Sequence, residues 1–148
     1  MISLPVESFT LAWMHSIEKV RWEEDYRVDG KQLLAPAARV KGSAAGMEPP
    51  ANAMLKNGWW HYRPTIRVHD ELRLTRSPFA QDYEICSNGR CKSLGEIAPQ
   101  AEGVTRLLAC AAVLSANQST GSPPYEEKAN SRTGEASASI LTGKPRQR

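Results

Sequence analysis

The chain has 148 residues, of which 41% are hydrophobic and 24% are charged, a composition typical of one soluble globular domain. Its net charge is +3, and residues 117–148 hold five basic and three acidic side chains, which leaves the preceding body nearly neutral. This balance disfavours nucleic-acid binding, because only residues 59–63 (WWHYR) combine basic and stacking side chains. No apolar run is long enough to insert into a bilayer as a spanning helix.

Residues 9–28 (FTLAWMHSIEKVRWEEDYRV) contain two alternating runs that predict a β-hairpin. With a turn at residues 17–18, the facing pairs on one side are His15–Val20, Trp13–Trp22, Leu11–Glu24 and Phe9–Tyr26. Aromatic cross-strand pairs therefore set the register, and this hairpin is the expected nucleus of the domain.

Glu24 falls on the apolar face of this hairpin, where an unpaired carboxylate is costly. Arg39, Lys41 and His61 are candidate partners, and a strand end open to solvent would also satisfy the carboxylate. Structural ion pairs outnumber functional ones, so a structural role is preferred.

Turn residues divide the next part of the chain into further strands. Asp29-Gly30 predicts a turn, and Pro36 predicts that the following segment is an edge strand or is broken there. Residues 37–41 form another predicted strand, and the Gly- and Pro-rich residues 42–50 form a loop. With Lys41 at its root this loop could cradle an anion, but a loop that covers the core is the preferred interpretation.

Three more strand segments follow that loop. Asn57-Gly58 predicts a type I′ hairpin between residues 53–56 and 59–62, and residues 71–75 alternate as a half-buried strand. In residues 83–94, Asn88-Gly89 predicts a second such hairpin, which places Cys86 opposite Cys91 in a closely spaced pair. A disulfide there would favour the periplasm or the cell exterior, while two reduced thiols or half of a zinc site are the alternatives.

The pattern changes after residue 94. Residues 103–116 (GVTRLLACAAVLSA) replace alternation with a run of Ala and Leu, which predicts one short helix preceded by a linker from residue 96. Residues 117–148 have few large apolar side chains and are expected to be disordered. The fold prediction is therefore an all-β, small antiparallel sandwich or partly open barrel over residues 4–95, built from hairpins, with a short C-terminal helix and a disordered tail.

Several separated blocks of residues 4–94 resemble the bacterial family called domain of unknown function 1850 (DUF1850). The pattern comprises a His-Ser-x-Glu-Lys turn, an acidic pair before an aromatic residue, a Gly-rich loop with Gly-Met, and a Gly-Trp segment. These fall on His15, Ser16, Glu18 and Lys19; on Glu23, Glu24 and Tyr26; on Gly42, Gly46 and Met47; and on Gly58 and Trp59. The resemblance implies a small all-β domain, often encoded near tripartite periplasmic (TRAP-type) transporters, with no established activity.

Two classes of function remain after these observations. The first is a non-enzymatic accessory or binding domain of the envelope, with transporter components as partners and no cofactor; its candidate site is His15, Ser16, Glu18, Lys19, Glu24 and Lys41. The second is a divalent-metal-binding or hydrolytic enzyme that uses His15, Glu18 and Glu24. Strand neighbours point to opposite faces, so His15 and Ser16 do not form a nucleophile and base pair, and the first class is preferred.

The compartment is expected to be the periplasm or envelope. No charged and apolar leader precedes the first strand, so the chain as given is expected to begin at the domain boundary. A truncated start, a processed form and a cytoplasmic variant would each explain this beginning.

Overall fold

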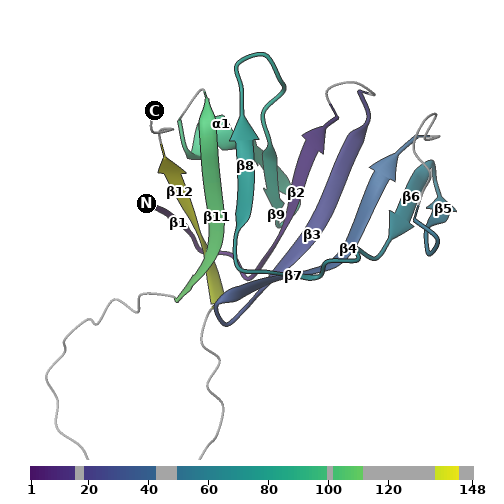
Figure 1. Cartoon of the computed structure of the whole chain (residues 1–148), viewed down its shortest axis with the longest axis horizontal. Helices are drawn as coiled ribbons and strands as arrows, with labels where there is room; N and C mark the ends of the chain where they lie inside the picture. The colour runs from purple at the N-terminus through teal and green to yellow at the C-terminus, as the bar shows by residue number, and fades with distance from the viewer. Residues whose placement is uncertain (16–18, 43–49, 100–101, 112–135, 144–148) are drawn as a thin grey trace, which may run out of the picture.

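The computed structural model describes residues 1–15, 19–42, 50–99, 102–111 and 136–143, which form two antiparallel sheets and one short helix (Figure 1). The elements in chain order are β1 (Ile2–Leu4), β2 (Ser8–Met14), β3 (Arg21–Asp29), β4 (Gln32–Lys41), β5 (Met54–Lys56), β6 (Trp59–Tyr62), β7 (Val68–His69), β8 (Leu72–Arg76), β9 (Glu84–Ser87), β10 (Arg90–Ser93), α1 (Leu94–Ile97), β11 (Gly103–Ala111) and β12 (Ala136–Gly143). In the part of the chain that is described, no helix is long and apolar enough to cross a membrane.

The larger sheet has the order β10-β9-β2-β3-β4-β6-β5, with β7 also paired to β4, and it consists mostly of sequential hairpins. The smaller sheet has the order β1-β12-β11-β8 and joins segments from both ends of the chain with one from the middle. Figure 1 shows the smaller sheet at the left and strands β4, β6 and β5 extending to the right. The sheets keep separate edges and do not close into a barrel, which confirms the all-β, antiparallel and open fold.

The first hairpin has the predicted register. Phe9 pairs with Tyr26, Leu11 with Glu24 and Trp13 with Trp22. The aromatic pairs stack, with ring centroids 5.5 Å apart for Phe9 and Tyr26 and 6.1 Å apart for Trp13 and Trp22. Residues 16–18 at the predicted turn lie outside the described residues.

Pro36 marks a change of partner within β4. The β3–β4 ladder shifts register between Asp25 and Arg27, and the other side of β4 pairs first with β7 and then with β6. Pro has no N–H for a ladder bond, so a bulge is where a strand tolerates it. The predicted edge or break at Pro36 is wrong, because β4 is one interior strand from Gln32 to Lys41 that includes the predicted strand at 37–41 and accommodates Pro36 at the register shift.

Both Asn-Gly hairpins form as predicted. Asn57 and Gly58 have φ values of 52° and 78°, and Asn88 and Gly89 have values of 53° and 73°, as a type I′ turn requires. Cys86 pairs with Cys91 across the second hairpin, and the two sulfurs form a disulfide with Cα atoms 4.0 Å apart.

The helix predicted over residues 103–116 is wrong for the described part of that segment, because Gly103–Ala111 forms strand β11. β11 lies between β8 and β12 and buries Thr105 and Leu107, so ladder bonds on both sides outweigh the helical preference of Ala and Leu. The one short helix of the described residues is α1, and a Ser93–Glu96 capping box caps its N-terminus. Residues 112–116 lie outside the described residues.

The disordered tail predicted for residues 117–148 is also wrong in part. Ala136–Gly143 forms strand β12 between β11 and β1, and Ile140 is completely buried. The segment mixes Ala and Leu, which favour helices, with Ile and Thr, which favour strands, and pairing on both sides decides for the strand. The domain therefore extends beyond the predicted 4–95 boundary, from β1 through β12. Residues 117–135 and 144–148 lie outside the described residues.

The core lies between the two sheets. Phe9, Leu11 and Leu33 of the larger sheet meet Leu74, Leu107 and Ile140 of the smaller one. The predicted strand at residues 71–75 is confirmed as β8, with Leu72 and Leu74 buried and Arg73 and Thr75 exposed. The inner face of the larger sheet is the face that carries this core.

Candidate functional site

A row of large apolar side chains crosses the inner face of the larger sheet near the ends of its strands. The register aligns Trp13 of β2 with Trp22 of β3, then Val40 of β4, Trp60 of β6 and Leu55 of β5. We call these five residues the tryptophan row. Its three indoles are half-buried, Val40 in the middle is buried and Leu55 is 59% exposed, so the row is most accessible at the β5 edge.

A second row on the same face runs beside the tryptophan row, two residues away on each strand, and contains the carboxylate of Glu24. It consists of Leu11, Glu24, Ala38 and Tyr62. The Tyr26 hydroxyl donates a hydrogen bond to Oε2 of Glu24, and the Trp22 ring meets Tyr62 edge-on at 6.5 Å. Glu24 thus lies beside the tryptophan row and is held by a tyrosine of its own strand.

The tyrosines around Glu24 are kept in the neutral form. Burial raises the pKa of Tyr26 far above its ordinary value of 10, and the hydrogen bond and charge of Glu24 raise it further. Burial, and then the charge of Glu24, also raise the pKa of Tyr62. A neutral phenol can donate to the carboxylate, so Tyr26 positions Glu24, for which the described part of the chain supplies no ion pair.

Two polar atoms of the tryptophan row are unsatisfied. The Nε1 atoms of Trp22 and Trp60 are buried and lack a hydrogen-bond acceptor in the described part of the chain. An indole N–H that is buried without an acceptor costs about 1–3 kcal/mol. In the described part of the chain this face is therefore less well satisfied than an ordinary interior.

The outer face of the same sheet carries an ion-pair network that we call the outer network. Arg21 bonds Glu23 at 2.9 Å and Glu84 at 2.8 Å, and Arg39 bonds Glu23 at 2.7 Å and Asp25 at 3.1 Å. Each guanidinium thus joins two carboxylates: Arg39 of β4 bonds two residues of the neighbouring β3, and Arg21 bonds Glu23 of its own strand and reaches across β2 to Glu84 of β9. The Thr10 hydroxyl donates to Asp25 at the end of the network.

The electrostatics of Glu23 follow from its two arginines. Partial burial would raise the pKa of Glu23, but hydrogen bonds from Arg21 and Arg39 together outweigh it and hold that pKa below its ordinary value of 4.5. Glu23 is therefore charged, and both of its carboxylate oxygens bond an arginine, which is typical of a structural role.

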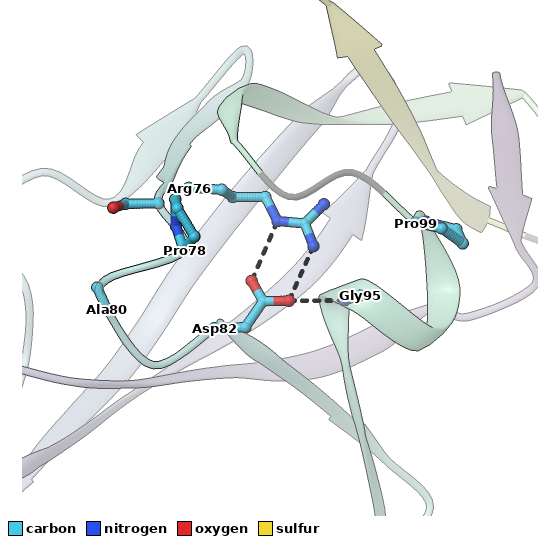
Figure 2. A pocket seen from close by; sticks show the side chains of 7 residues that line it. Arg76, Pro78, Ala80, Asp82, Gly95 and Pro99 are labelled. Atoms are coloured by element: carbon cyan, nitrogen blue, oxygen red, sulfur yellow. Dashed lines mark hydrogen bonds and ion pairs between the residues drawn. The ribbon is translucent and has the colours of Figure 1, made fainter.

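A second charged group lies in a pocket of about 470 Å³ beside α1 (Figure 2). The Arg76 guanidinium donates twice to Asp82, at 3.1 and 2.8 Å, and its remaining Nη1 donates to the Ala98 carbonyl at 2.8 Å. Asp82 in turn accepts from the Gly95 N–H at 2.7 Å. A Cβ at Gly95 would lie 3.1 Å from Asp82, so the glycine permits this contact. These bonds fix the 77–83 loop and α1 to the smaller sheet and serve structure.

Among the described residues of the predicted site, the structure separates Glu24 from His15. His15 and Glu24 share the inner face, but Glu24 pairs with Leu11, four residues before His15, a separation of about 13 Å at 3.3 Å per residue. The Lys19 N–H donates to the His15 carbonyl at 2.9 Å, and the Lys41 ammonium lies 5.8 Å from the Trp59 ring centroid. Ser16 and Glu18 lie outside the described residues, as does most of the 42–50 loop.

The proposed partners of Glu24 are also wrong. Arg39 and His61 lie on the outer face, where Arg39 bonds Glu23 and Asp25, because the ladder pairs Glu24 with Ala38 and Glu23 with Arg39. Tyr26 holds Glu24 instead. Alternation within β3 places positions 24 and 26 on one face, so this partner was available to sequence reasoning and was overlooked.

Sequence reasoning also missed Trp60 and Leu55 as continuations of the Trp13–Trp22 pair. The signal was the Asn57-Gly58 turn, which fixes Leu55 opposite Trp60, but the pairing of β6 with β4 is a tertiary fact. A potential metal group of Glu84, Cys86 and Cys91 has its ligand atoms within 4.8 Å, but both sulfurs are joined in the disulfide.

Comparison with known families matches residues 9–94 to the model described as Domain of unknown function (DUF1850). The chain belongs to the DUF1850 family. The matched range contains the tryptophan row, Glu24 with its tyrosines, the outer network and the disulfide. Strands β1, β11 and β12 of this DUF1850 chain lie outside it. No curated protein and no solved structure matches the chain.

Proposed function

We propose that this DUF1850 chain is a non-enzymatic binding domain of the bacterial envelope that contacts a component of a TRAP-type solute transporter through its tryptophan row. The observation that carries the proposal is the continuous row itself, which becomes exposed towards Leu55 at the β5 edge. Tryptophan and the other aromatic side chains are enriched at the centres of protein interfaces. The association with a transporter rests on the genomic neighbourhood that the family resemblance implies.

The chemistry of the row favours a protein partner. The indole rings of Trp13, Trp22 and Trp60 are half-buried and offer flat apolar area to a partner. Glu24 and Tyr62 border the row and offer polar contacts for orientation. Apolar area with a few fixed polar groups at its margin is the usual composition of a recognition surface.

The disulfide supports a location outside the cytoplasm. Cys86 and Cys91 are bonded across the β9–β10 hairpin, and structural disulfides persist mainly in oxidising compartments. Intact mass of the exported protein, measured with and without reductant before alkylation, tests this part. Loss of two alkylatable thiols in the unreduced sample is expected, and two free thiols at these positions would overturn the envelope location.

The alternative metal or hydrolytic site is not favoured by the geometry. A metal ion needs its ligand atoms within a few ångströms of one another, and His15 and Glu24 lie about 13 Å apart along the hairpin. The stacked Trp13–Trp22 pair lies between their register positions. Glu24 is engaged by Tyr26, which is a positioning contact for a fixed carboxylate.

Direct binding to transporter components tests the proposal. The exported chain is titrated against the solute-binding subunit and the nanodisc-embedded membrane subunits of a TRAP-type transporter from the same genome. Saturable binding is expected, and Leu55→Asp should weaken it at least about tenfold by placing a charge on the exposed end of the row. Leu55 is 59% exposed, so the variant should melt like the wild type.

Met54→Asp is the matched control. Met54 neighbours Leu55 on β5, is 73% exposed, and pairs with His61 on the opposite face. Its substitution adds the same charge to the same edge strand and should leave binding unchanged. Absence of binding by the wild type to every subunit would overturn the transporter partner, and equal effects of the two variants would remove the tryptophan row as the contact surface.

A further inference from the structure

A groove of about 940 Å³ lies at the opposite edge of the larger sheet from β5, and the tryptophan row does not use it. Its lining comes from the end of β1 and the residues after it, from the β9–β10 hairpin, and from α1. Apolar side chains in this lining are Leu4, Val6, Ile85 and Ile97. The groove is therefore an apolar surface between the edges of the two sheets.

Two cations border the groove. Arg90 and Lys92 line it from β10 and are both exposed. The one carboxylate in the lining, Glu96, accepts a hydrogen bond from the Ser93 N–H at 2.8 Å in the capping box of α1. Its charge is thus partly committed to the helix start, and the groove presents two positive charges against one negative charge.

The edge beside the groove offers backbone hydrogen bonds. β10 is the terminal strand of the larger sheet, and β1 is the terminal strand of the smaller one. In the two-residue hairpin, Arg90 and Lys92 form the pairs that bond to β9, so the N–H and C=O of Cys91 between them point away from the sheet. An open N–H and C=O between two cations is suited to an extended chain.

We infer that this groove binds an extended acidic peptide segment of a protein partner, which adds to the β10 edge at Cys91 and directs its carboxylates to Arg90 and Lys92. Apolar residues of the segment cover Leu4, Val6 and Ile85. Charge complementarity selects an acidic segment over a neutral or basic one. Among the described residues no strand pairs with the outward N–H and C=O of Cys91, and this favours a peptide over an anionic amphiphile, because only a peptide matches the hydrogen bonds of a strand edge.

The test uses a labelled heptapeptide of sequence Glu-Thr-Val-Thr-Glu-Thr-Val, whose Glu and Val side chains share one face of an extended strand, titrated into the full chain by fluorescence anisotropy. Saturable binding is expected, and the same peptide with Lys in place of Glu should bind at least about tenfold more weakly. The double variant Arg90→Glu, Lys92→Glu should lose binding of the acidic peptide and gain binding of the basic one. Both side chains are exposed, so thermal melting should be unchanged.

A charge-matched control uses Lys31→Glu, Lys56→Glu, which changes the net charge equally at exposed positions in the β3–β4 turn and on the edge strand β5, neither of which lines the groove. This control should bind the acidic peptide as the wild type does. Equal loss in both double variants would show non-specific charge attraction and overturn the site.

The strand pairing has its own readout. Peptide binding should slow exchange of the Cys91 amide proton, and N-methylation of alternate peptide amides should abolish binding. If the methylated peptide binds equally well, or if dodecanoate binds at the groove and the peptide does not, the peptide assignment is overturned. Leu55→Asp should not alter peptide binding, so failure here is distinguishable from failure of the transporter contact.

Discussion

The two faces of the larger sheet treat charge in opposite ways. On the outer face, three carboxylates and two arginines alternate in the outer network, and every guanidinium bonds two carboxylates. On the inner face, Glu24 lies among aromatic side chains and is held by the Tyr26 hydroxyl. On the outer face several ion pairs stabilise the charged groups together. On the inner face, among the described residues, Glu24 is stabilised by one hydrogen bond beside the tryptophan row.

This difference shows that the inner face, and not the outer face, has features that a purely structural role does not require. A distributed network on a half-exposed face tolerates the loss of one member, since each ion pair contributes only a few tenths of a kcal/mol to about 1 kcal/mol. A single carboxylate on an apolar face depends on its one donor. The inner face also holds the two unsatisfied indole N–H groups, so both of its departures from ordinary packing fall in the region proposed to bind a partner.

The largest expected effect is the difference in the free energy of unfolding between a variant in the buried core of the inner face and one at its exposed β5 edge. Leu33 is completely buried in the core, so Leu33→Ala should lower the free energy of unfolding by about 2–5 kcal/mol through lost burial and the remaining cavity. Leu55→Ala makes the same chemical change at a position 59% exposed and should cost no more than about 0.5 kcal/mol. Urea denaturation of both variants measures the difference, and comparable losses would contradict the view that the row is open at β5.

A smaller effect on the free energy of unfolding is expected when the hydrogen bond between Tyr26 and Glu24 is removed. Tyr26→Phe removes the hydroxyl that bonds Glu24 and should lower the free energy of unfolding by about 1–3 kcal/mol. Glu24→Gln in the same background completes a double-mutant cycle, and the double variant should lose less than the sum of the two single losses. Additive losses would mean that Tyr26 and Glu24 are not energetically coupled.

Tyr26→Phe should also change how the stability of the protein depends on pH in the alkaline range. Burial and then Glu24 raise the pKa of Tyr26 above its unfolded value of 10, so the unfolded chain releases this proton first. Stability conferred by Tyr26 is therefore fully present below about pH 10 and falls as the pH rises further. Tyr26→Phe should make that decline shallower, while Tyr62 and Tyr83, whose pKa values are also raised, maintain the remainder.

The smallest effect is expected on the outer face. Arg21 and Arg39 hold the pKa of Glu23 below its unfolded value of 4.5, so its contribution is present at neutral pH and is lost as the pH falls below that value. Glu23→Gln should cost about 1 kcal/mol at pH 7 and make the acid decline of stability shallower. Glu7→Gln at an exposed position is the control, and an identical acid profile for the two variants would argue against the network.

The amino-acid sequence by itself determined the local pairings of this protein. Alternation set the Phe9–Tyr26 and Trp13–Trp22 pairs, and the two Asn-Gly turns set their hairpins and brought Cys86 opposite Cys91. Such pairs are fixed by side-chain parity and by turns whose backbone angles only a few residues accept, so they need no knowledge of the rest of the chain. The DUF1850 resemblance lies in the same hairpin-rich range.

Only the tertiary structure decided what lies beside what at long range. The Ala- and Leu-rich β11 and the Ser- and Ala-rich β12 became strands because each has a partner on both sides, and no local preference of theirs predicts it. The tryptophan row likewise needed the pairing of β6 with β4, and the groove needed β1 to approach the β9–β10 hairpin. Both proposed surfaces arise from contacts between distant segments, whose free energy depends on the packed core and not on local sequence.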